Sequence, residues 1–271
     1  MALFFRSMLR QRNPEDFGAF PWKIPAIRAL AELKLKTSVT FLIGENGSGK
    51  STLLEAMAIG MRAVAVGSTE LDVDATMAGS RELARAYRFE RRGVPKARMF
   101  LRAEDVFGFS NRIIAQMKEF QNMKDGFRET LSDGSRGQFE AMALAEKEKA
   151  ILASRYGVDP HARSHGESFL HLLKTRLVPN GLYFLDEPET PLSPTRVLAL
   201  LVLIHDSVNA GSQFVIATHS PILLAFPLAE ILRLDHSNIS VTSYEEVENV
   251  RTMRDFLNDP QRYLQKLFRP D

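Results

Sequence analysis

The chain has 271 residues, 45% of them hydrophobic, which is enough for one sizeable domain or for a domain with a lobe inserted in it. It contains no cysteine, so disulfides and thiolate zinc sites are excluded, and the composition suits a reducing cytoplasm. No apolar run reaches the roughly 20 residues that a membrane-spanning helix needs, and a formal net charge of +2 is too balanced to indicate a nucleic-acid partner by itself.

Residues 1–12 predict an opening strand rather than a secretion signal, because they lack a long apolar region and a small-residue cleavage site. An aromatic and proline-rich patch follows at residues 20–25. A short amphipathic segment around Leu30, Leu33 and Leu35 then leads into the next strand.

Residues 40–54 predict a strand, a loop and a helix in succession. The β-branched and aromatic run stops at Gly44, and glycines in the loop accept the positive φ angles that turn successive N–H groups toward an anion. Lys50 is placed to reach the β- and γ-phosphates of a nucleotide, and the Ser51 hydroxyl to complete a magnesium shell. A chance match in a glycine-containing turn is disfavoured by the strand before it and the helix after it. The residues predicted to hold the nucleotide are Gly44, Glu45, Asn46, Gly47, Ser48, Gly49, Lys50, Ser51 and Thr52.

Two further features each allow two interpretations. Phe20 or Trp22 lies roughly where a nucleotide-binding protein of this kind can place a ring against adenine, and a core position is the alternative for both. Residues 78–102 are rich in basic side chains, which can line a phosphate-rich partner such as DNA or form a solvated face, the commoner case. The basic residues are Arg81, Arg85, Arg88, Arg91, Arg92, Lys96, Arg98 and Arg102, opposed by Glu82 and Glu90.

Residues 97–109 predict a strand that runs into a loop, and two segments with helical spacing of apolar residues follow. One lies near residues 113–120 and the other at residues 139–152, with a polar loop between them. We therefore predict a small helical lobe inserted at residues 105–170. It has no sustained heptads and is too short for a long coiled-coil arm.

The second half of the chain returns to alternating strands and helices. Residues 181–185 and 213–217 are continuous apolar runs of the kind buried on both faces of a sheet, and each ends in polar residues. A leucine-rich helix is predicted between them at residues 194–206, and the tail after residue 244 predicts a strand end and helices. Three buried strands that end in glycine or polar residues predict a parallel sheet whose carboxyl ends form one crevice. The expected fold is a single α/β P-loop NTPase domain over residues 1–271, mostly parallel, with an antiparallel N-terminal β portion.

Candidate catalytic groups follow the two later strands. Asp186 and Glu187 are consecutive at a strand end, so their side chains leave the sheet differently. Asp186 is predicted to hold magnesium opposite Ser51, and Glu187 to polarise or deprotonate the attacking water. His219 follows the neighbouring strand, where it can touch the γ-phosphate; a purely structural histidine is the alternative.

Residues 163–173 predict a turn followed by a helix. Ser164 and Glu167 have the spacing of a capping box. The same helix start also presents N–H groups and a positive dipole end to a phosphate. Taken alone, these residues favour capping.

Together, the motifs resemble the ABC-type ATPases. Gly44–Ser51 looks like Walker A, Leu182–Glu187 like Walker B with its catalytic glutamate, and Thr218–Ser220 like the switch histidine. Residues 164–167 are similar to the signature, and residues 189–194 to the D-loop. The five motifs stand in register, and the remainder looks like small stand-alone bacterial ATPases near the SMC and RecF group rather than transporter subunits.

The resemblance implies a mechanism with ATP and Mg²⁺ as ligands. Two copies would face each other head to tail, with Ser164, Gly166 and Glu167 of one copy closing over ATP on the phosphate loop of the other. Hydrolysis to ADP and phosphate would then release the homodimer. The implied catalytic residues are Glu187, His219 and Lys50, and the implied metal site comprises Ser51, Asp186 and Glu104. Glu104 stands where the family often has glutamine, while His165 and Glu167 depart from the usual signature.

This resemblance favours a cytoplasmic ATP-hydrolysing switch that acts on or near DNA in repair or defence. The ATP-binding subunit of a membrane transporter is one alternative, which needs a membrane partner protein. A module that uses ATP to dimerise with little turnover is another, and an unidentified partner protein is compatible with each.

Overall fold

The structure is a computed structural model that describes residues 3–12, 20–66, 75–130, 135–156, 165–235 and 238–268. Its core is a seven-stranded sheet of order β10-β9-β3-β8-β7-β6-β4. The neighbouring strands pair in parallel except for β10 and β9, which are antiparallel. The expected mostly parallel sheet is therefore confirmed. The strands are β3 (Val39–Gly44), β4 (Val64–Ala65), β6 (Arg98–Arg102), β7 (Leu182–Asp186), β8 (Gln213–Ala217), β9 (Glu230–Leu234) and β10 (Ile239–Thr242).

Helices cover both faces of this sheet, which is why its central strands are apolar without alternation. Every residue of β7 and β8 is buried. One face packs Phe184 and Val215 against α2 (Lys50–Gly60), α3 (Ala78–Ala86) and α1 (Pro25–Ala29). The other face packs Tyr183 and Phe214 against α6 (His165–Arg176), α7 (Pro194–Asn209) and α8 (Pro221–Leu224).

A smaller antiparallel sheet of order β2-β1-β5 lies at the N-terminal side, as the sequence predicted. Its strands are β1 (Phe5–Arg10), β2 (Glu32–Lys34) and β5 (Tyr87–Arg91). Phe5 and Met8 of β1 are fully buried and belong to the same apolar cluster as α2. The small sheet is thus fixed against the helix that starts at the phosphate loop.

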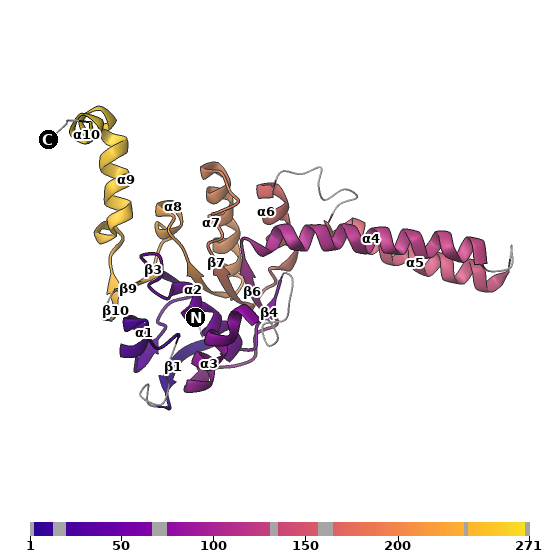
Figure 1. The fold of residues 1–271 in the computed structure, drawn as a ribbon, viewed down its shortest axis with the longest axis horizontal. Coiled ribbons are helices and arrows are strands. Elements are labelled where there is room, and N and C mark those ends of the chain that lie inside the picture. Colours follow the sequence, from indigo (N-terminus) through magenta and orange to yellow (C-terminus); the bar gives the residue numbers. More distant parts are fainter. Residues whose placement is uncertain are drawn as a thin grey trace.

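The insert is an antiparallel helical hairpin that projects from the body, formed by α4 (Asp105–Thr130) and α5 (Arg136–Tyr156) (Figure 1). A helix of 26 residues is about 39 Å long. Lys124 pairs with Glu146 across the two helices, and Lys149 Nζ donates to Gln121 Oε1 at 2.7 Å. Both predicted helical segments are present, but the expectation that the insert is too short for an arm is wrong, because helices of 26 and 21 residues pair lengthwise and project from the body.

The chain ends in α9 (Glu248–Asn258) and α10 (Pro260–Leu267), which rise from the β10 edge of the sheet, opposite the hairpin edge (Figure 1). Short 3₁₀ turns precede α3 at Ala75–Met77 and α9 at Tyr244–Glu246. Among the described residues, no helix combines the length and the apolar character needed to cross a bilayer.

Candidate functional site

The phosphate loop connects β3 to α2 in the predicted way. Gly44, Gly47 and Gly49 have φ angles of 151°, 80° and 97°. At Gly49, a Cβ atom would also meet Ile27 Cδ1 at 2.9 Å. A side chain at Gly49 would therefore be strained by its backbone conformation and crowded by the core.

Lys50 is the first residue of α2 and is 5% exposed. Its Nζ donates to the carbonyl oxygens of Gly44 and Glu45, both at 2.9 Å. Burial lowers its pKa, while the carboxylates of Glu187 and Asp186 oppose that shift. The ammonium group therefore lies over the loop, where a bound phosphate can replace the two carbonyl acceptors.

Ser51 and Asp186 meet although 135 positions separate them in the chain. The Ser51 hydroxyl donates to Asp186 Oδ1 at 3.1 Å. Burial at the end of β7 raises the pKa of Asp186 to about 7, against the hydrogen bond from Ser51. A hydroxyl and a carboxylate are oxygen ligands of the type that Mg²⁺ prefers, so this pair fits that cation.

Glu187 leaves the sheet in a different direction from Asp186. Its φ of 46° lies in the left-handed region, and its side chain is 46% exposed, against 9% for Asp186. Glu187 Oε1 lies 4.0 Å from His219 Nε2. The predicted separation of the two carboxylates is thus present, with Glu187 turned toward the histidine.

His219 follows β8 and carries a buried Nε2 that has no hydrogen-bond partner in the part of the chain that the structure describes. Burial lowers the pKa of His219, and the Lys50 charge adds to that shift, although Glu187 and Glu189 oppose it. At neutral pH the ring is therefore uncharged, and Nε2 is available to a ligand on either tautomer.

Glu189 is a residue whose role sequence reasoning missed. Its Oε1 accepts from Thr218 Oγ1 at 2.6 Å and from the His219 N–H at 2.8 Å. One carboxylate oxygen therefore holds the segment that carries the histidine. The acidic residue two positions after Glu187 was a signal in the sequence, but its partners follow only from the packing of the two loops.

A buried ion-pair cluster centred on Arg102 lies next to Asp186. The Arg102 guanidinium pairs with Glu55, and its Nε lies 4.0 Å from Asp186 Oδ2. Glu104, predicted as a metal residue, is 78% exposed and lies 3.9 Å from Arg102. No contact among the described residues joins Glu104 to Ser51 or Asp186. Its metal role stays a prediction.

The basic segment at residues 78–102 is partly engaged inside the protein. Arg98 Nη1 donates to the Met61 carbonyl at 3.3 Å, and Arg91 donates to the Gly60 carbonyl. Arg102 pairs with Glu55. Three basic residues of this segment therefore bind carbonyl or carboxylate groups of the protein itself, at or near α2.

The signature-like segment is described only from His165, the first residue of α6; Ser164 lies outside the described residues, and with it the capping alternative. Gly166 is buried, and a Cβ there would lie 2.8 Å from the Pro191 carbonyl oxygen. Glu167 Oε1 accepts from Arg196 Nη2 at 2.7 Å. Close packing of α6 on the D-loop-like segment thus requires glycine, while a role toward a second copy stays a prediction.

The structure places the two aromatic candidates in different surroundings. Trp22 is 3% exposed, and its Nε1–H donates to Glu82 Oε1 at 2.8 Å, so of its two interpretations the core position is the one that the structure shows. Phe20 is 52% exposed, and its ring lies against Gly79, where a Cβ would come within 2.5 Å. Neither ring lines the cavity beside the phosphate loop.

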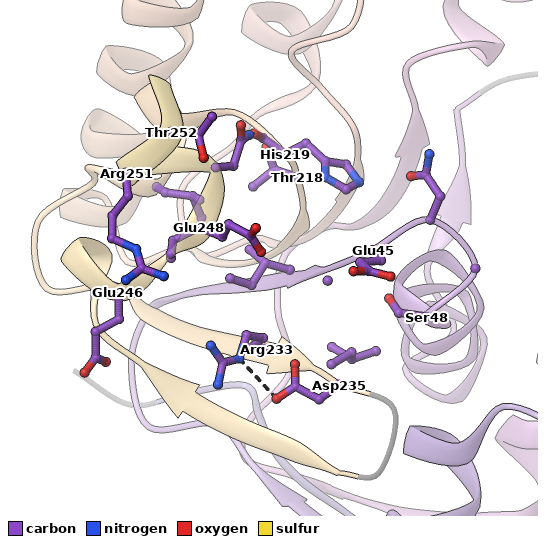
Figure 2. A pocket seen from close by; sticks show the side chains of 18 of the residues that line it. Glu45, Ser48, Thr218, His219, Arg233, Asp235, Glu246, Glu248, Arg251 and Thr252 are labelled. Atoms are coloured by element: carbon purple, nitrogen blue, oxygen red, sulfur yellow. Dashed lines mark hydrogen bonds and ion pairs between the residues drawn. The ribbon is translucent and has the colours of Figure 1, made fainter. Parts of the chain in front are cut away.

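That cavity has a volume of about 540 Å³ and lies between the phosphate loop and α9 (Figure 2). Its polar lining includes His219 and several charged side chains from β9 and α9. The lining residues are Ile24, Pro25, Ile43, Gly44, Glu45, Asn46, Gly47, Ser48, Thr218, His219, Leu224, Arg233, Leu234, Asp235, Glu246, Val247, Glu248, Asn249, Arg251 and Thr252.

Comparison with protein families finds one model that matches residues 95–225, described as "AAA domain, putative AbiEii toxin, Type IV TA system". No protein of curated function matches the chain.

Solved structures similar to the chain include three ABC proteins at low identity. CbiO1 from Clostridium perfringens, part of the ABC transporter complex CbiONQ, is 17% identical, with 97% of this chain and 100% of that chain covered and a TM-score of 0.46. An ATP-binding subunit of an ABC transporter is 15% identical over 83% of this chain and 88% of that chain, with a TM-score of 0.41. The ATP-binding cassette MJ0796, a dimer in a post-hydrolysis state with ADP and Pi, is 18% identical over 80% of this chain and 90% of that chain, with a TM-score of 0.38.

The strand order itself places the phosphate loop after β3, with β9 on one side of that strand and β8 and then β7 on the other. Helices on both faces and the helical insert complete the arrangement. The chain has an α/β P-loop NTPase fold, with a mostly parallel seven-stranded sheet between helices, a small antiparallel N-terminal sheet and a helical insert.

Proposed function

We propose that the protein binds ATP with Mg²⁺ and hydrolyses it to ADP and phosphate. One observation carries the proposal: Lys50, Ser51, Asp186, Glu187 and His219 converge at the carboxyl ends of the adjacent strands β3, β7 and β8. In a parallel sheet this edge is where nucleotides bind, and each of the five side chains has a separate task there.

Phosphate binding is assigned to the phosphate loop, residues 44–52. The inward N–H groups and the N-terminus of α2 attract the phosphate oxygens, and Lys50 supplies a positive charge at the β- and γ-phosphates. Ser51 and Asp186 would hold Mg²⁺, which would neutralise part of the negative charge of the phosphates. Glu104 remains a predicted metal residue, and its exposed carboxylate lies 3.9 Å from the Arg102 guanidinium.

Glu187 is the proposed general base. Its carboxylate accepts a proton from water while the water oxygen forms a bond to the γ-phosphorus and the bond to the β,γ-bridging oxygen breaks. His219 Nε2, 4.0 Å from Glu187, is placed to contact the γ-phosphate or the attacking water. Glu189 keeps this histidine segment in position through its two hydrogen bonds.

ATP-dependent head-to-tail homodimerisation is the second part of the proposal. Glu187 and His219 are 46% and 40% exposed, so a second copy can cover them and exclude water from the reacting groups. The α6 start, with Gly166 and Glu167, is the proposed surface that the second copy presents. The partial match to an AbiEii-type family model supports a role in defence, and DNA is a candidate partner for that role.

The test compares wild type with Glu187→Gln by size-exclusion mass and phosphate release, each with ATP and magnesium. Glutamine keeps the size of the side chain and removes the base, so the variant should accumulate as an ATP-bound dimer while phosphate release collapses. Glu119→Gln, at an exposed position on the hairpin, makes the same chemical change away from the site and should match wild type.

A Glu187→Gln variant that stays monomeric and hydrolyses ATP like wild type would show that Glu187 is not the base. If wild type turns over but neither protein dimerises, hydrolysis stands and the partner role of α6 is lost. ATP-dependent dimers of wild type without phosphate release would instead identify a dimerisation module.

A further inference from the structure

The cavity beside the phosphate loop is continuous with the proposed phosphate site. It begins at Gly44–Ser48 and extends to α9. A ligand with its phosphates on the loop must place its remaining atoms to one side of it. The volume of about 540 Å³ is in the range of small-molecule sites, roughly 300 to 1,000 Å³.

Its apolar walls come from well-separated parts of the chain. Side chains from the α1 start, β3, α8, β9 and the α9 start contribute to them, and Val247 and Leu234 are buried in the core clusters. Such walls give a flat ring apolar contact on surfaces that are held in place by the fold. The apolar lining residues are Ile24, Pro25, Ile43, Leu224, Leu234 and Val247.

The charged lining selects what fits between these walls. Carboxylates of Glu45, Asp235, Glu246 and Glu248 outnumber the guanidinium groups of Arg233 and Arg251. Arg233 Nε also pairs with Asp235 Oδ2 at 3.1 Å. An acidic excess disfavours a second anion here, whereas ionised carboxylates accept hydrogen bonds from hydroxyl and amino groups.

The α9 side of the cavity is attached to the histidine segment. Asn249 Nδ2 donates to the His219 carbonyl oxygen, and Glu248 extends from α9 toward the phosphate loop (Figure 2). A ligand that spans the cavity therefore contacts the phosphate loop at one end and the helix that braces His219 at the other.

From this geometry we infer that the cavity binds the nucleoside part of the nucleotide, with α9 as its outer wall and cavity carboxylates as acceptors for ribose or base donors. This inference rests on the proposed function, because it takes the phosphates to lie on the loop. The nucleoside is the uncharged, hydrogen-bond-donating part of the ligand, which matches the acidic and apolar lining.

The experiment measures the affinities of ATP and of inorganic tripolyphosphate, each with magnesium, by titration calorimetry. Thr252→Trp fills the cavity from an exposed position on α9. It should weaken ATP binding at least about tenfold and leave tripolyphosphate binding unchanged, since only the nucleoside is displaced. Met253→Trp is the matched control, because Met253 is the next residue of α9, is 48% exposed and does not line the cavity.

Glu248→Gln provides a second variant without added bulk, and it should weaken ATP binding several-fold while sparing tripolyphosphate. If both variants bind ATP like wild type while tripolyphosphate still binds, the nucleoside lies elsewhere, and the phosphate site survives. Equal weakening of ATP and tripolyphosphate also contradicts the inference, because the variants then act on the loop. If wild type binds neither ligand, the proposed function itself fails.

Discussion

Removing the guanidinium of Arg102 should strongly destabilise the fold. Arg102→Met keeps an unbranched apolar stem in place of the arginine stem, but it leaves Glu55 without its cation. The two side chains are only 16% and 7% exposed, so water screens the loss little. Loss of one partner of a buried ion pair costs about 3 to 5 kcal/mol.

The Glu55 carboxylate keeps one other hydrogen bond, from Ser80 Oγ at 2.6 Å, so we expect the lower end of that range, about 3 kcal/mol. Urea denaturation followed by circular dichroism measures the loss. The double variant Arg102→Met/Glu55→Gln should recover part of it, because residue 55 then carries no uncompensated charge. A single variant that loses under about 1 kcal/mol, or a double variant whose losses simply add, would refute the reasoning.

Three further predictions address individual residues of the site. Burial raises the pKa of Asp186 to about 7, so between pH 4 and pH 7 the native state holds a proton that the unfolded state has released. The free energy of unfolding should therefore fall from pH 4 to pH 7, by at most about 4 kcal/mol. Urea titrations should show a shallower fall for Asp186→Asn, and equal slopes for the two proteins would contradict the assignment. Gly166→Ala should cost about 1 to 3 kcal/mol, since its Cβ would lie 2.8 Å from the Pro191 carbonyl, whereas thermal unfolding of Gly137→Ala, with nothing within 4 Å, should show no such loss. Glu189→Ala should lower phosphate release at least about tenfold with ATP affinity retained, because the His219 segment loses its acceptor; turnover equal to that of Glu119→Ala would exclude this positioning role.

The parts of the fold that the sequence predicts are those that depend on local pattern. Glycine spacing at 44, 47 and 49 and the apolar runs of β7 and β8 need no knowledge of distant residues. The meeting of Ser51 with Asp186 was also foreseeable, because parallel strands bring their carboxyl ends to one edge.

What the sequence does not reveal depends on tertiary packing. A basic run looks the same whether its arginines are solvated or buried, and only the fold shows Arg102 beside Glu55. The presence of a tryptophan at position 22 does not indicate that its ring is buried and donates a hydrogen bond to Glu82. The spacing of apolar residues in α4 and α5 predicts helices, but not their projection as an arm (Figure 1).

Residues 189–194 connect the segment that carries His219 with the start of α6. At one end Glu189 bonds Thr218 and His219, and in the middle the Pro191 carbonyl packs against Gly166 at the start of α6. This short segment therefore contacts both the histidine segment and the helix start that we propose as the surface presented to a second copy. In the proposed dimer, departure of the γ-phosphate from His219 would alter the contacts of α6 in the same chain, and each copy would thereby report the state of its own nucleotide to the site of its neighbour.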